Sequence, residues 1–130
     1  MNKRTRVLTG SPWEHVVGYS RAIRVGNRVE VAGTTSMLNG QVVGGDDAYA
    51  QAKYILETIE DSLKKVGAEI DDVVRTRMYV TNISQWEEIG KAHGEFFRGI
   101  QPVSTMVEVS GLIDSRLLVE IEAEAIIGSE

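Results

Sequence analysis

Charged and apolar residues alternate along several short stretches of the chain, with the period of two that is typical of β-strands. Residues 28–31 alternate charged side chains with valine, and residues 71–81 (DDVVRTRMYVT) have the branched and aromatic composition of a strand. The Gly26-Asn27 pair tolerates the positive φ angles of a tight turn, so it predicts a β-hairpin between its flanking strands. Further strands are predicted at residues 4–8, 105–109 and 117–127.

Two longer stretches have the spacing of three and four residues that is typical of helices. The first begins after Asp46, a suitable cap, and ends before Gly67; its apolar positions are Ala52, Ile55, Leu56, Ile59, Leu63 and Val66. The second is predicted from Ser84 and Glu87, which have the spacing of a capping box. Its broad apolar face holds Trp86, Ile89, His93, Phe96 and Phe97.

These elements follow one another in the order βββαβαββ, without regular alternation of strands and helices. We therefore expect an α+β fold, with a six-stranded mixed sheet and both helices on one face. The chain has 130 residues and no internal change of composition, so residues 1–130 are predicted to form a single domain.

The sheet face away from the helices carries charged residues. Glu120, Glu122 and Glu124 point to one side of the last strand, and Arg75, Arg77 and Tyr79 share one side of another. Cross-strand ion pairs account for most of these charges. Two helices seldom cover the whole apolar area of a sheet, so we also expect this semi-polar face to meet further copies of the chain.

Charge and composition narrow the function. Fourteen basic and nineteen acidic residues give a formal net charge of -5, which argues against nucleic acid as a partner. The chain has no cysteine, and carboxylates two apart on a strand stand about 7 Å apart, too far to share an ion, so we expect no metal and no cofactor. No signal peptide or membrane-spanning run is evident, which predicts a cytoplasmic protein.

Three segments resemble the RidA family, also called YjgF: GYSRAIRVGNRVEVAGTT, DVVRTRMYVTNISQWEEIGKAHGEFF and PVSTMVEVSGLIDSRLLVEIEAEAI. The resemblance covers almost the whole chain. It implies a chorismate-mutase-like fold and a homotrimer with small-molecule clefts between subunits. It also implies hydrolysis of imine and enamine intermediates, whereas older descriptions of the family speak of ribonuclease activity.

The functional residues of that family carry over only in part. Tyr19 matches the tyrosine of the cleft, and Glu120 matches the acidic residue thought to place or activate water. The arginine that grips the substrate carboxylate in deaminating members is replaced by Ser104, and two further polar positions are Ala32 and Gly90 here.

Loss of that arginine makes imino-acid deamination doubtful, because a serine offers one neutral hydrogen bond in place of a charge-assisted pair. With no cation expected near Glu120, we infer a neutral or cationic ligand, not a carboxylate derived from an amino acid. The cleft walls are expected to hold Tyr19, Ser104, Thr105 and Glu120, with Trp13, His15 and Met106 as further candidates.

Three functions remain open at this point. The first is a trimer that binds a small metabolite between subunits, as an enzyme or a regulatory module. The second is a hydrolase of a different imine or enamine, with Glu120 holding the water. The third, an endoribonuclease using His15 and His93, is the weakest, because nothing in the sequence brings the two histidines together. His93 lies on an apolar helical stripe and is interpreted as a packed residue.

Overall fold

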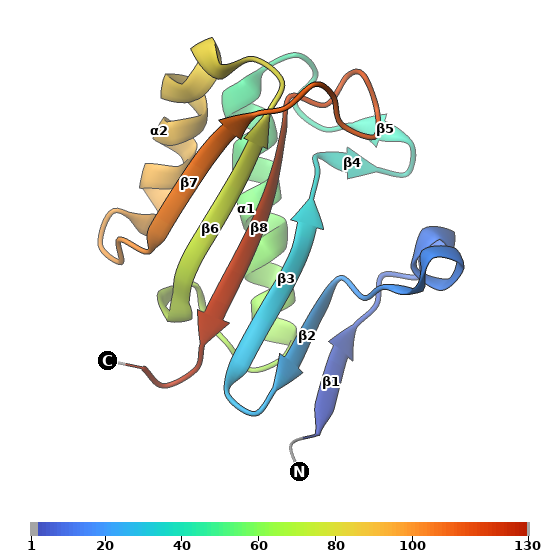
Figure 1. Cartoon of the computed structure of the whole chain (residues 1–130), viewed down its shortest axis with the longest axis vertical. Helices are drawn as coiled ribbons and strands as arrows, with labels where there is room; N and C mark the ends of the chain where they lie inside the picture. The colour runs from blue at the N-terminus through green and yellow to red at the C-terminus, as the bar shows by residue number, and fades with distance from the viewer. Residues whose placement is uncertain (1–2, 130) are drawn as a thin grey trace.

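A computed structural model describes residues 3–129 and contains one six-stranded sheet covered by two helices on one face (Figure 1). The strand order is β1-β2-β3-β8-β6-β7, in which only β6 and β7 run parallel. The predicted α+β class and the element order are confirmed. The strands of the sheet are β1 (Arg4–Val7), β2 (Ala22–Val25), β3 (Arg28–Thr34), β6 (Val73–Val80), β7 (Val103–Glu108) and β8 (Val119–Ile126).

The smaller elements lie in the connections. A two-stranded hairpin occupies the glycine-rich stretch after β3, and short helical turns precede β2, β6 and the second long helix. These elements are η1 (Glu14–Gly18), β4 (Met37–Leu38), β5 (Gln41–Val42), η2 (Ile70–Asp72) and η3 (Ile83–Gln85). None of the helices within residues 3–129 is long and apolar enough to cross a membrane.

The cap of helix α1 (Ala48–Lys65) lies one residue later than predicted. The side chain of Asp47, not Asp46, accepts a hydrogen bond from the amide of Ala50. Two consecutive aspartates leave this choice open in the sequence, because either one suits the cap. At the other end Gly67 has a φ of 86°, as a residue that closes a helix in the left-handed region requires.

Helix α2 (Trp86–Phe97) does not use the predicted capping box. Asn82 caps the preceding turn η3, and its side chain accepts hydrogen bonds from the amide and the hydroxyl of Ser84. The chain therefore enters α2 through a 3₁₀ turn, and Trp86 at its first position is largely exposed. The predicted apolar face is thus correct for Ile89 and Phe97 but not for Trp86.

The core lies between the sheet and the two helices. Every second residue of β8 points into it, and three of these four are alanine or valine, which lets α1 approach the sheet closely. Burying each large aliphatic side chain contributes about 1.5–3 kcal/mol. The largest fully buried aliphatic side chains are Ile55, Leu56, Ile59, Leu63, Ile89, Leu117 and Ile121.

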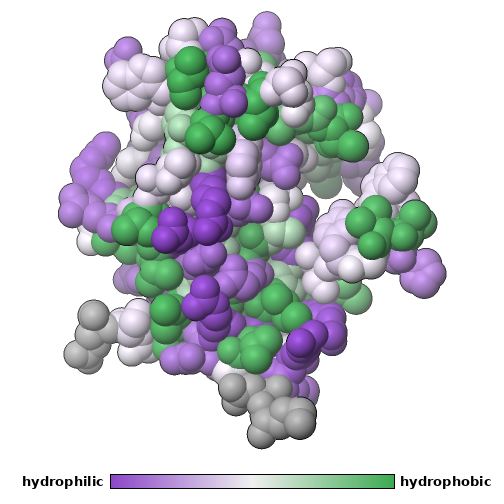
Figure 2. All heavy atoms as spheres, in the orientation of Figure 1, coloured by the Kyte–Doolittle hydropathy of each residue, from purple (hydrophilic) through white to green (hydrophobic). Residues whose placement is uncertain are grey.

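The opposite face of the sheet, which we call the open face, is covered by no other element within residues 3–129 and faces the viewer in Figure 1 and Figure 2. Arg77 Nη1 lies 3.2 Å from Glu124 Oε1 and 3.9 Å from Glu122 Oε1. The Tyr79 hydroxyl donates a 2.8 Å hydrogen bond to Glu122. The predicted cross-strand ion pairs are therefore present.

Candidate functional site

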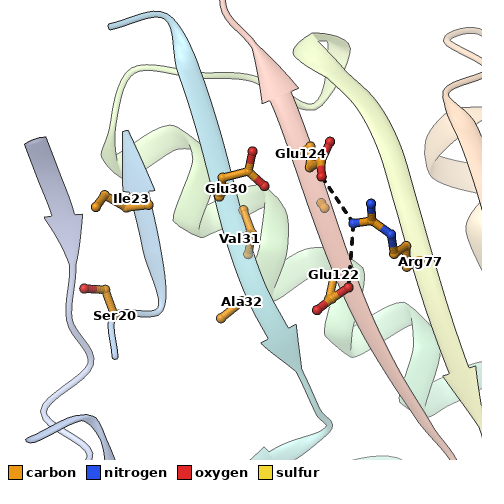
Figure 3. A pocket seen from close by; sticks show the side chains of 9 residues that line it. Ser20, Ile23, Glu30, Val31, Ala32, Arg77, Glu122 and Glu124 are labelled. Carbon is orange, nitrogen blue, oxygen red and sulfur yellow. Dashed lines mark hydrogen bonds and ion pairs between the residues drawn. The ribbon is translucent and has the colours of Figure 1, made fainter. Parts of the chain in front are cut away.

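A shallow hollow of about 270 Å³ lies on the open face, over β2, β3, β6 and β8 (Figure 3). Its charged side chains largely satisfy one another, because Arg77 is held between Glu122 and Glu124. Ala32 also lines it, with no polar group to offer a ligand. The hollow is thus a poor candidate for a binding site within one chain.

Glu120, the predicted catalytic residue, lies on the open face of β8, beside the end of the neighbouring strand β3. Its carboxyl group lies against Gly33 of β3, where no side chain takes up the space. Burial raises the pKa of Glu120 above the ordinary 4.5; the nearby Arg21 opposes this shift, and Glu122 adds to it. A half-buried carboxyl group with a raised pKa is a better proton acceptor than one in water.

Arg21 is a functional candidate that the sequence analysis did not identify. Its guanidinium donates a 2.6 Å hydrogen bond from Nη2 to the carbonyl of Gly33 and lies 5.9 Å from the centre of the Tyr19 ring. Its Nε is buried without a hydrogen-bond partner among the described residues. The expectation that no cation lies near Glu120 is therefore wrong, because the charge of Arg21 acts on this carboxyl group.

The segment of residues 8–20, which we call the arm, projects beside β1 (Figure 1). It is fixed by Glu14, which is buried and whose carboxylate accepts hydrogen bonds from the amides of Thr9 and Gly10 and from the Thr9 hydroxyl. Below it is a hollow of about 560 Å³ lined by Tyr19 and His15, among others. Trp13 does not line this hollow and is 65% exposed.

Ser104 lies on the other side of the sheet. It pairs in register with Thr76 of β6, whose side chain is buried toward the helices. Thr76 Oγ1 is 2.8 Å from Ser104 Oγ and 2.8 Å from His93 Nε2 of α2. The interpretation of His93 as a packed residue holds, since its ring also lies 4.6 Å from that of Phe97, but it belongs to a polar chain as well.

The predicted site residues thus fall into two groups within one chain. Tyr19 and Glu120 are brought together around Arg21 on the open face. Ser104 is on the helix-covered side, and so is Met106, which packs partly against the core. Thr105 alternates with them and is exposed on the open face of β7.

We find no group of three or more His, Asp or Glu side chains positioned to hold a metal ion within residues 3–129.

The chain matches known proteins over nearly its full length. The family model described as endoribonuclease L-PSP matches residues 10–127. An uncharacterized protein of Streptomyces coelicolor is 40% identical over 95% of this chain and 92% of its own length. A RutC family protein of Pyrococcus abyssi is 35% identical over 82% of this chain and 84% of its own length.

Solved structures agree with these sequence matches. A crystal structure from Mycobacterium tuberculosis, described as a member of the YjgF/YER057c/UK114 family, is 51% identical with a TM-score of 0.88, covering 96% of this chain and 100% of that one. A Rid family protein of unknown function from Yersinia pestis is 27% identical with a TM-score of 0.83, covering 96% and 100% of the two chains.

Proposed function

Because the chain belongs to the endoribonuclease L-PSP family, also called the YjgF or Rid family, we propose that it binds a small metabolite in clefts shared between copies of itself. The observation that carries this proposal is the separation of the two groups of site residues. Glu120 and Ser104 lie on opposite sides of one sheet, so a single ligand can touch both only if they come from different copies.

Exposed apolar surface supports association. The arm carries Trp13, Val16 and Val17 at 65%, 71% and 68% exposure, and the edge strand β7 exposes Val103 and Val107. In Figure 2 the arm stands out from the body with apolar side chains at its outer end. In the proposed homotrimer the arm of one copy packs near β7 of the next, and each open face turns toward the other two. Such a closed ring gives every copy the same pair of contacts.

Hydrolysis of an imine or enamine is the second candidate, and the raised pKa of Glu120 favours it. The Glu120 carboxylate would accept a proton from water as the oxygen adds to the imine carbon. Return of that proton to the nitrogen would give a carbinolamine. Glu120 would then take the proton of the adduct hydroxyl and pass it to the nitrogen as the C–N bond breaks, releasing ammonia and a carbonyl compound. Atoms and charge balance with water as the only co-reactant.

Ribonuclease activity is named in the family description but finds little support in the described residues. Acid–base cleavage of RNA needs two titratable groups at one phosphate. His15 and His93 line different hollows of the chain. The net charge of -5 also gives no attraction for a polyanion.

The first test is the mass of the protein in solution. Mass photometry and light scattering should give a trimer at micromolar concentration, and a protein that is only monomeric would exclude the shared cleft. The second test is a panel of imines generated in the assay by amine and amino-acid oxidases, including imines without a carboxylate. Glu120→Gln should abolish turnover and keep the trimer if the protein is a hydrolase; if no imine is turned over, only binding remains.

Mixed trimers test whether the two groups act on one ligand. For a substrate that is turned over, Glu120→Gln and a bulky Ser104→Trp should each be inactive alone. Co-refolding the two in equal amounts should restore about a quarter of the clefts, because random assembly gives that share of interfaces two intact halves. No recovery in assembled mixed trimers would contradict a cleft that combines Glu120 of one copy with Ser104 of the next.

A further inference from the structure

A third hollow, of about 280 Å³, lies beside the connection from α2 to β7, and the course of this connection can be followed in Figure 1. It is lined by His93, Gly94, Phe97, Arg98, Gln101 and Pro102. It lies on the helix side of the sheet, away from Glu120, and it is formed by one chain alone. The hollow therefore does not depend on a second copy.

Arg98 is the one charged residue in this lining. Its guanidinium makes no hydrogen bond or ion pair with any residue within 3–129. It lies across Gly94, where a Cβ would stand only 3.1 Å from Nη2, so the missing side chain of Gly94 gives it room. A cation at a helix end is favourable by itself, but here all its donors remain available to a ligand.

His93 lines the same hollow and can supply a second donor in one of its tautomers. Its Nε2 is engaged with Thr76, and its Nδ1 is neither hydrogen-bonded nor among the buried unpartnered atoms of the described chain, so solvent reaches it. A neutral imidazole carries one proton, on either nitrogen. When Nδ1 carries that proton, Nε2 must accept from the Thr76 hydroxyl.

The direction of the hydrogen bond between His93 and Thr76 fixes the direction of the bond between Thr76 and Ser104. The Thr76 hydroxyl has one proton and is fully buried, with His93 and Ser104 as its side-chain partners. If it donates to His93, it accepts from the Ser104 hydroxyl, and Ser104 then presents only lone pairs to its surroundings. If His93 donates from Nε2, the chain reverses and Ser104 presents its proton.

We propose that this hollow binds a small oxyanion, a carboxylate or a phosphate, between Arg98 and His93 Nδ1–H, and that the bound anion sets Ser104 as a hydrogen-bond acceptor. Arg98 supplies the charge-assisted hydrogen bonds that hold the anion. His93 is a positioning residue for Ser104, acting through Thr76. The part of the proposed cleft at Ser104 then prefers a ligand group that donates, such as an amine or a hydroxyl. This last step rests on the proposed function, whereas anion binding does not.

Titration with acetate and, separately, with inorganic phosphate tests the anion site. NMR should show saturable shifts at the Arg98 side chain and a His93 ring whose nitrogen shifts move to the Nδ1–H tautomer. Arg98→Gln should weaken binding about tenfold or more, as for loss of a charge-assisted bond. Lys91→Gln, which removes one positive charge from the same helix outside the hollow, should leave it unchanged. Equal weakening by both variants, or no saturation in either arm, would overturn the proposal.

The relay to Ser104 is tested with the same probe. Acetate should shift the Ser104 signals in the unaltered protein and in Thr76→Ser, which keeps the hydroxyl, but not in Thr76→Val. If Thr76→Val does not fold, Ser104→Ala at the exposed end of the chain replaces it: the His93 tautomer should then respond to acetate while the Thr76 hydroxyl no longer accepts from residue 104. A Ser104 response that persists in Thr76→Val would overturn the relay. These outcomes are independent of whether the protein is a trimer.

Discussion

The carboxyl group of Glu120 occupies the space that a side chain on Gly33 would fill. A Cβ on Gly33 would stand 3.0 Å from Glu120 Cδ and closer still to Oε2. We expect Gly33→Ala to push the carboxyl group into solvent and to lower the pKa of Glu120 toward 4.5, since burial is what raises it. The colliding group is the flexible end of a side chain, so the stability cost should stay below about 1 kcal/mol.

Carboxyl carbon NMR measures this pKa directly, and thermal unfolding measures the stability. If an imine substrate is turned over, its rate should fall about 100-fold in Gly33→Ala, as for a displaced general base. Gly33→Ala in a Glu120→Gln background should then cause no further loss. An unchanged pKa of Glu120 in the folded variant would show that its carboxyl group does not depend on the space at Gly33.

Gly90 is the opposite case. It lies inside α2, and a Cβ built there meets no atom within 4 Å. Gly90→Ala should therefore stabilise the protein by about 0.5–1 kcal/mol, because alanine loses less backbone entropy in a helix. Gly67→Ala is the contrasting variant: its φ of 86° and the nearby Arg24 make a side chain unfavourable, and its midpoint of urea unfolding should fall. A loss of stability in Gly90→Ala would contradict this expectation and would mean that the added methyl group meets atoms that are absent from the single chain.

The sequence predicted the elements well because the alternation of residues and the turn at Gly26 are local signals. It did not predict on which side of the sheet Ser104 lies. In β7 one side carries Val103 and Thr105 and the other Ser104 and Met106, so neither is clearly apolar. Parallel pairing with β6 decides the matter, and that contact joins residues 28 positions apart in the chain.

The site around Glu120 was predicted only in part for a similar reason. Its approach to Gly33 and Arg21 follows from the register shift of β3 against β8 between Val31 and Thr34. No local pattern in the sequence predicts this bulge. The sequence therefore predicted Tyr19 and Glu120 as single site residues, but it did not predict that Arg21 lies beside Glu120.

Glu14 ties the beginning of the arm to its helical turn, since its carboxylate accepts hydrogen bonds from Thr9 and Gly10. Its burial acts to raise its pKa, but the hydrogen bonds from Thr9 and Gly10, with the charge of Arg21, outweigh burial and leave the pKa below 4.5. Glu14→Gln replaces one acceptor oxygen by an NH2 group that can only donate, which should cost about 1–3 kcal/mol of local stability. Hydrogen exchange at the amides of Thr9 and Gly10 should accelerate in this variant.

Acid should have the same effect on the unaltered arm. Because the pKa of Glu14 is lowered on folding, its contribution is present above pH 4.5 and is lost as the pH falls through the folded value. Glu57→Gln, at an exposed position of α1, is the matched control and should exchange like the unaltered protein. Normal protection of Thr9 and Gly10 in Glu14→Gln would mean that the conformation of residues 9–14 does not depend on the Glu14 carboxylate.

His93 should make the protein less stable in mild acid. Burial lowers the pKa of His93 below its ordinary 6.5, so near and below that pH the unfolded chain binds more protons than the folded one. Stability therefore rises with pH through this window and falls on acidification. Urea unfolding of His93→Gln at about pH 7.5 and about pH 5 should show a smaller loss on acidification than the unaltered protein. His15→Gln removes the other histidine, from the exposed arm, and should keep the full loss. An equal loss of stability in His93→Gln and the unaltered protein would contradict this prediction. It would mean that the fold does not oppose protonation of His93 and that the hydrogen bond to Thr76 is kept when the ring is charged.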